Sequence, residues 1–278
     1  MSNHLFFKLL IKSGYFTIGM LLIWMGLNEF LSAHIWDGMT VSKSALTVEY
    51  CEFNHVNKFF HQPMNTYSNL AYFFFGVLII QIAWEDYKNR GKKSLNRMAQ
   101  FPLLSALMGI YFIYLSFGSA FFHASLTYVG QRVDMNGTYG VSITLLSIGF
   151  YHILHKIDFS DTLKYIWAGA SVLIIMAFLK IALLISSSVL LPMMILLLTL
   201  MNVINYFQFR KERSILIAIL SFALIIIALK IRTLDVQKIG CDPYSFYQGH
   251  ALWHFLTALS SFCSYAFFRF SKLPIVNH

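Results

Sequence analysis

Polar residues able to do chemistry gather in three short segments of an otherwise apolar chain. Residues 118–123 (GSAFFH) end one apolar stretch, Gln131 and Asp134 lie shortly beyond it, and residues 249–254 (GHALWH) open another. Ionisable groups inside a membrane span are costly, so they mark functional sites by default. These segments are therefore where we look for a catalytic or binding site.

The histidine spacing suits a metal ion. His250 and His254 are four residues apart, so on a helix they share a face and both rings can turn toward one ion. Catalytic zinc usually takes three protein ligands and leaves a fourth position for water. His123 can supply the third ligand, and Ser119 lies one turn before it on the same face. Asp134 could orient a water there or take its proton, so the pattern predicts a catalytic zinc site.

Simpler explanations exist for each of these residues. A pair of histidines four residues apart also fits a haem ligand pair, a structural helix contact or chance. A serine in a membrane helix usually bonds the carbonyls of its own helix, and Asp134 could pair with Arg132 or Lys238. Four other histidines fall at span ends or in loops, where we expect interfacial positions: His55, His61, His152 and His155.

The composition indicates that lipid is the solvent. The 278 residues are 58% hydrophobic and only 12% charged, whereas soluble domains carry about 25% charged residues. Apolar runs of about 20 residues, enough to cross a bilayer, recur along the chain. The net charge of +9 comes from basic residues between these runs, which argues against nucleic-acid binding. We predict an all-α, polytopic membrane helix bundle.

Eight transmembrane helices are predicted, with both chain ends on the same side. The loops on that side carry 14 Lys and Arg residues, and the opposite loops carry 7. By the positive-inside rule both termini are cytoplasmic, and all three polar segments face the outer, periplasmic or lumenal side. The first span could instead be a cleaved signal peptide, but no clear cleavage site follows it. The predicted spans are 14–34, 66–84, 101–124, 137–155, 163–182, 187–207, 214–231 and 249–270.

Two cysteines fall in outer loops of this topology. Cys51 follows the first span and Cys241 precedes the last, so both face the oxidising side, where disulfides persist. We predict a Cys51–Cys241 disulfide; the alternative is two unrelated free thiols. Cys263, inside the last span, is expected to be a packed thiol.

Four motifs in a fixed order resemble the alkaline ceramidases, within a superfamily of membrane hydrolases that also includes adiponectin-receptor-like proteins. The resemblance runs from about residue 49 onward. It implies a seven-helix membrane domain over 49–278, to which residues 1–48 add an N-terminal anchor helix and outer loop. The motifs are Tyr50-Cys51-Glu52-x-Asn54, Gln62-x-x-Asn65-Thr66-x-Ser68-Asn69, Gly118-Ser119-x-x-Phe122-His123-x-x-Leu126 with Gln131 and Asp134, and His250-Ala251-x-Trp253-His254.

The resemblance also implies roles for individual residues. The zinc ligands of the family fall on His123, His250 and His254, and its serine and aspartate beside the zinc fall on Ser119 and Asp134. The family's paired cysteines match Cys51 and Cys241.

The N-terminal motif of the family is a calcium site built largely from acidic residues. Its last acid is replaced here by an amide, and the spacing is shortened by about one residue. Calcium takes six to eight oxygens, several from carboxylates, so this change should weaken binding, and retention of the ion stays open. The equivalents in this chain are Glu49, Tyr50, Glu52, Asn54 and Gln62.

The expected activity is zinc-dependent hydrolysis of the N-acyl bond of a ceramide-type sphingolipid, giving a fatty acid and a sphingoid base. One alternative is a related membrane hydrolase acting on another lipid amide or ester. Another is a receptor-like protein with structural zinc, against which Ser119 and Asp134 argue, because structural sites are usually closed by four protein ligands. A haem-binding electron carrier is the last alternative.

Overall fold

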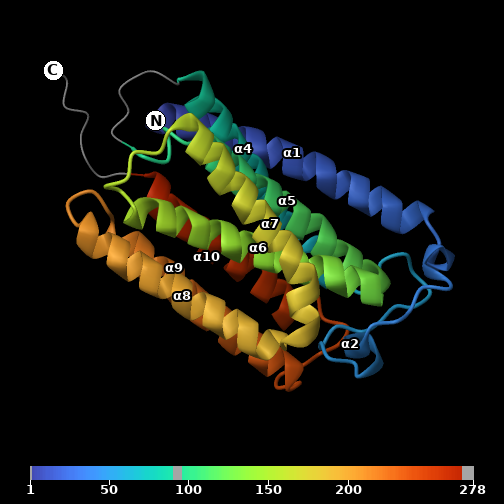
Figure 1. The fold of residues 1–278 in the computed structure, drawn as a ribbon. Helices are drawn as coiled ribbons and strands as arrows, with labels where there is room; N and C mark the ends of the chain where they lie inside the picture. The colour runs from blue at the N-terminus through green and yellow to red at the C-terminus, as the bar shows by residue number, and fades with distance from the viewer. Residues whose placement is uncertain (1, 90–95, 271–278) are drawn as a thin grey trace.

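The chain folds into a bundle of long helices, as the computed structural model of residues 2–89 and 96–270 shows (Figure 1). The loop between α1 and α4, which we call the outer loop, holds the short elements η1 (Ala33–Trp36), α2 (Lys43–Leu46) and α3 (Pro63–Tyr67), and the end of the bundle that it covers is called the outer end. The long helices are α1 (Asn3–Phe30), α4 (Leu70–Lys88), α5 (Pro102–Ser125), α6 (Tyr128–Ile153), α7 (Asp161–Leu184), α8 (Ser187–Gln208), α9 (Ile215–Val236) and α10 (Gly249–Arg269).

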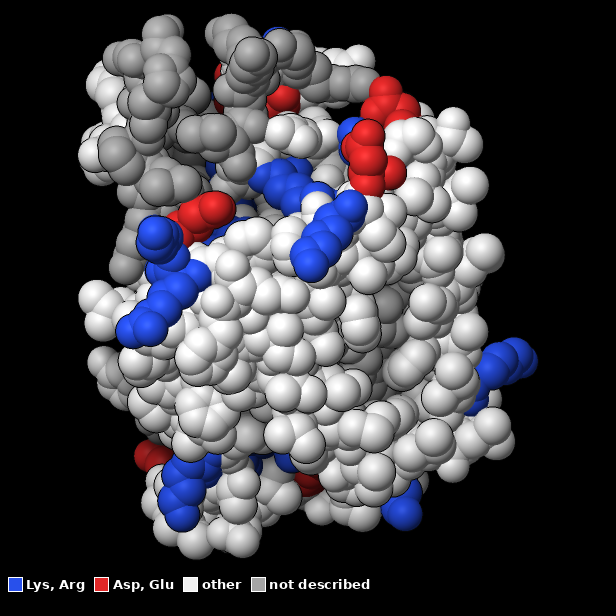
Figure 2. Space-filling view, turned by 60° about the vertical axis from the view of Figure 1, so that its left-hand side comes forward, with Lys and Arg blue, Asp and Glu red and all other residues white. Residues whose placement is uncertain are grey.

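The bundle has the character of a multi-pass membrane protein. Seven helical segments of the described chain are long and apolar enough to cross a bilayer, and α6 is the long helix that is not among them. It has 26 residues but carries Gln131, Arg132, Asp134 and Asn136 near its start. Figure 2 shows Lys, Arg, Asp and Glu side chains mainly at the two ends of one face, with a broad uncharged band between them. The predicted all-α polytopic bundle is confirmed.

The helix that carries Asp134 begins earlier than predicted. We expected a span from 137, but α6 starts at Tyr128 because the Thr127 side chain accepts from the backbone N–H of Gly130 at 3.1 Å. Leu126 ends α5 in the left-handed region, with φ of 52°, so two residues reverse the chain. Helix α1 likewise begins at Asn3 rather than 14, capped by Ser2.

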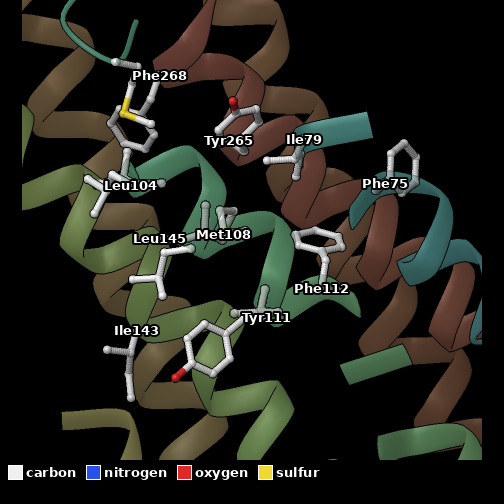
Figure 3. Close-up of a cluster of buried hydrophobic side chains, with 14 of the residues drawn as sticks. Phe75, Ile79, Leu104, Met108, Tyr111, Phe112, Ile143, Leu145, Tyr265 and Phe268 are labelled. Atoms are coloured by element: carbon white, nitrogen blue, oxygen red, sulfur yellow. The ribbon is translucent and has the colours of Figure 1, made fainter. Parts of the chain in front are cut away.

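Helices α4 and α5 pack closely against each other at Gly76 and Gly109. A Cβ added to Gly76 would lie 3.0 Å from the Gly109 carbonyl oxygen, and one added to Gly109 would lie 2.9 Å from that of Gly76. Small residues let membrane helices approach this closely. Buried side chains of α4, α5, α6 and α10 pack into one apolar core (Figure 3).

The inner end of the bundle contains a histidine that was misread. His152 was expected at the interface but is fully buried, with its ring 5.1 Å from that of Phe268 and its Nδ1 2.9 Å from the Ile148 carbonyl oxygen. The prediction was wrong because it considered only the position of His152 near the end of a span. The sequence does not show that α10 packs against it there. Four of the basic residues assigned to the inner side lie outside the described residues: Arg90, Lys92, Lys93 and Lys272.

A buried ion pair also ties the inner ends of α4 and α10 together. Arg269 Nε donates to Asp86 Oδ2 at 2.8 Å, and both side chains are less than 10% exposed. Removing one partner of a buried pair leaves a charge without compensation, at a cost of about 3–5 kcal/mol. We therefore expect Asp86→Ala to lower the free energy of unfolding by about that amount, measured by thermal unfolding in a fixed detergent.

The adjacent Glu85 provides a matched control for this stability prediction. Glu85 pairs with Lys88 at 3.0 Å on the surface, where ion pairs contribute about 0–1 kcal/mol. Glu85→Ala should therefore change the unfolding temperature little. Equal losses of stability in the two variants would contradict the structural role assigned to the Asp86–Arg269 pair.

Candidate metal centre

Three histidines from two helices meet at the outer end of the bundle. His123 comes from the last turn of α5, and His250 and His254 come from the first turns of α10. One ring nitrogen of each lies within 4.8 Å of the others, and all three side chains are buried. The ring centroids are separated by 4.9 Å (His123–His250), 5.0 Å (His123–His254) and 4.5 Å (His250–His254).

Hydrogen bonds orient two of these rings from behind. His123 Nδ1 donates to the Gln62 side-chain oxygen at 2.7 Å, and His254 Nδ1 lies 2.8 Å from Ser68 Oγ. Metal-binding histidines usually engage their second ring nitrogen in this way, which fixes the tautomer and the ring orientation. The His123 Nε2 atom is buried and has no hydrogen-bond partner among the described residues, so it is free to bind an ion.

The third ring is held by packing and by its backbone. Tyr50 lies against His250, with ring centroids 3.9 Å apart. The His250 backbone N–H donates to Asp235 Oδ1 at 3.2 Å, and the other oxygen of that carboxylate accepts from the Cys51 backbone N–H, also at 3.2 Å. Burial raises the pKa of the Tyr50 phenol, which is therefore neutral.

The donor set fits a transition metal such as zinc. Imidazole nitrogens suit zinc, copper, iron and nickel, whereas magnesium and calcium prefer oxygen. Three converging histidines with a buried, unpartnered His123 Nε2 match the three-ligand pattern of catalytic zinc. The predicted histidine cluster is thus present, and it can hold a metal ion.

Ser119 and Asp134 line the same small cavity as His250 and His254. This cavity has a volume of about 130 Å³. Ser119 Oγ is buried and makes no hydrogen bond of ordinary length in the described chain, but it lies near enough to the Asp134 carboxylate to interact with it. The alternative ion pair of Asp134 with Arg132 is not formed, because the Arg132 guanidinium donates to the carbonyls of Leu179 and Ala182 on α7. A hydroxyl and a carboxylate therefore line the same cavity as two of the histidines.

A larger apolar cavity adjoins the histidine site inside the bundle. It has a volume of about 490 Å³, and its walls come mainly from α6, α8, α9 and α10. Five residues line both cavities: Tyr72, Leu115, Thr138, Leu191 and Trp253. The shared walls place this apolar space directly beside the polar site.

A disulfide and backbone hydrogen bonds hold the outer loop over the histidine site. Cys51 and Cys241 form a disulfide, whereas Cys263 is a buried free thiol in α10. The loop also bonds the end of α5, because the backbone N–H groups of His61 and Gln62 donate to the carbonyls of Ala124 and His123, both at 3.0 Å. The loop therefore closes over the histidines from the outer side.

The five residues matched to a calcium site lie in this loop, and the side chains of four of them make hydrogen bonds of ordinary length to other protein groups. Glu52 accepts from the backbone N–H groups of Met64 at 2.6 Å and Asn65 at 2.8 Å. Burial raises its pKa to about 7, although these two N–H groups act in the opposite direction. Glu49 accepts from Arg232 at 3.2 Å, and Asn54 accepts from Gln62 at 2.7 Å.

The sequence analysis did not identify the residues that hydrogen-bond to the histidines and to the loop residues beside them. Ser68 was quoted within a motif but given no role, and Asp235 and Arg232 were not singled out. Asp235 is a buried acid near the outer end of α9. An intramembrane acid is a functional signal, so it could have been found by the argument that identified Asp134.

Comparisons with known proteins give one match. A family model described as Ceramidase matches residues 42–275. Searches of curated proteins and of solved structures returned no significant match.

Proposed function

Because this chain belongs to the ceramidase family, an assignment that covers α4 to α10 and most of the outer loop, we propose that it is a zinc-dependent membrane amidase that hydrolyses the N-acyl bond of ceramide-type lipids. The observation that carries this proposal is the meeting of His123, His250 and His254 beside Ser119 and Asp134. The products are a fatty acid and a sphingoid base.

Zinc bound by the three imidazoles supplies Lewis acidity, which can lower the pKa of a water from 15.7 to about 7. Asp134 accepts the proton of the attacking water at a carboxylate oxygen and delivers it to the nitrogen of the leaving amine. The Ser119 hydroxyl donates to the oxyanion that develops on the attacked carbonyl, an interaction that is strong in a site shielded from water. One water is consumed as the C–N bond breaks.

The adjoining apolar cavity supports a lipid substrate. A substrate amide at the histidines would leave its hydrocarbon in the 490 Å³ space between α6, α8, α9 and α10. Burying each CH₂ group there contributes about 0.8 kcal/mol. We propose that this cavity binds a hydrocarbon chain of the lipid, while the polar head stays near the outer loop.

We further propose an orientation in which both termini are cytoplasmic and the metal centre lies toward the outer side. The two-to-one distribution of Lys and Arg between the two sets of loops supports this orientation. Residues 49–278 would form the catalytic domain. Helix α1 would be an additional N-terminal helix, and it packs along α4.

The proposal is tested by supplying the purified, zinc-loaded protein with matched lipids. We expect release of fatty acid from an N-acyl sphingoid base, and much less from a diacylglycerol and from a simple N-alkyl fatty amide of equal chain length. Product is measured by mass spectrometry. Preferential cleavage of the glycerolipid would instead identify a related lipid hydrolase, and no cleavage of any of the three would favour a receptor-like protein.

A further inference from the structure

The residues matched to the calcium site do not fit a calcium ion. Calcium binds six to eight oxygens, with several carboxylates among them. Of the two carboxylates here, Glu52 accepts two backbone N–H bonds at the start of α3, and Glu49 accepts from Arg232. The amide oxygens of Asn54 and Gln62 are also bonded to protein donors. Protein hydrogen bonds thus occupy the positions that a cation would need.

Gln62 is the residue on which these bonds converge. Its side chain is 2% exposed. Its Oε1 accepts from His123 Nδ1 at 2.7 Å and from Asn65 Nδ2 at 3.2 Å, and its Nε2 donates to Asn54 Oδ1 at 2.7 Å. One amide therefore joins the metal-site histidine to the outer loop through two short hydrogen bonds.

An amide can serve both ends of this link without a cation. When His123 Nε2 binds a metal, Nδ1 carries the proton and needs an acceptor. Gln62 must then present its oxygen to His123 and its NH₂ group to Asn54. A carboxylate at this position could accept from His123, but it has no hydrogen to offer to Asn54 Oδ1, so either Asn54 would turn its own NH₂ group toward it or two oxygens would face each other. A cation between such oxygens resolves that conflict, and a glutamine removes the need for it.

We propose that Gln62 is a positioning residue for the metal ligand His123, and that its amide replaces calcium as the link between the outer loop and the metal centre. The enzyme is then independent of calcium. This inference shares the metal centre with the proposed function, but it concerns how His123 is held, and it can be tested without any lipid substrate.

The test measures zinc affinity by competition with a chelator, and unfolding temperature, for the full-length protein in detergent. Moving the wild type from millimolar CaCl₂ to calcium-depleted buffer at the same free zinc concentration should change neither quantity. Gln62→Leu should weaken zinc binding about 10–100-fold, as loss of an outer-shell partner does. Gln62→Glu keeps an acceptor opposite His123 Nδ1 and should retain most of the affinity.

Gln81 provides the matched control. It is an amide on α4 that bonds Ser13 of α1 at 2.7 Å, so Gln81→Leu should leave zinc affinity unchanged. The proposal is overturned if Gln62→Leu binds zinc as tightly as Gln81→Leu, or if Gln62→Glu binds as weakly as Gln62→Leu. A wild-type protein that loses stability in calcium-depleted buffer at fixed free zinc, and regains it with Ca²⁺, would also overturn it, whether or not the variants fold.

Discussion

Asp134→Asn is expected to lower the rate of ceramide hydrolysis by on the order of a thousandfold while leaving the bound metal in place. Asparagine has nearly the shape of aspartate but cannot accept the proton of the attacking water or return it to the amine. The carboxylate lines the cavity beside His250 and His254 but is not part of the histidine cluster. The measurement is kcat on one defined ceramide, with metal content determined on the same sample.

A carboxylate remote from the reaction serves as the control for Asp134. Asp37 lies on the outer loop, with its side chain 73% exposed and paired with His34. Asp37→Asn should keep wild-type kcat and metal content. If Asp134→Asn retained full activity, the proposed proton transfer would be wrong even with the metal site intact.

His250→Ala is expected to abolish both metal retention and activity. It removes one of three ligands, so zinc affinity should fall by more than the 10–100-fold loss typical of outer-shell changes. The imidazole is buried and packed against Tyr50 at 3.9 Å, so the unfolding temperature must be recorded with zinc content and turnover. His34→Ala, which alters an exposed histidine, is the matched control.

The result for His250 decides whether the three histidines bind a catalytic metal ion or only pack against one another. An enzyme with a three-histidine centre loses activity in proportion to its lost metal. If His250→Ala kept its zinc and its activity, the ion would be bound elsewhere, and the convergence of the three rings would be a packing arrangement.

Most helices and the pairing of two of the three clustered histidines could be predicted because their signals are local. Apolar runs give the spans directly, and the spacing of His250 and His254 places two rings on one helix face. The start of α6 could not be found in the same way. Polar residues near its outer end, Gln131 and Asp134 among them, obscure the hydrophobic signal, and the Thr127 cap becomes recognisable only once the turn at Leu126 is known.

Contacts made by irregular backbone were beyond sequence reasoning. The motif containing Gln62 and Ser68 marked the region, but no periodicity shows that these two side chains reach His123 and His254. Resemblance matched Gln62 to a possible calcium site and left retention of the ion open. The hydrogen bonds of its amide to His123 and to Asn54 depend on the tertiary arrangement of the outer loop, which no motif shows.

Metal analysis combined with zinc-edge X-ray absorption of the purified protein tests the central claim most directly. The account predicts one zinc per chain, with imidazole nitrogens at about 2.0–2.1 Å and no sulfur ligand. A protein that folds without any bound transition metal, or a zinc ion bound by sulfur, would contradict the claim that His123, His250 and His254 form its metal centre.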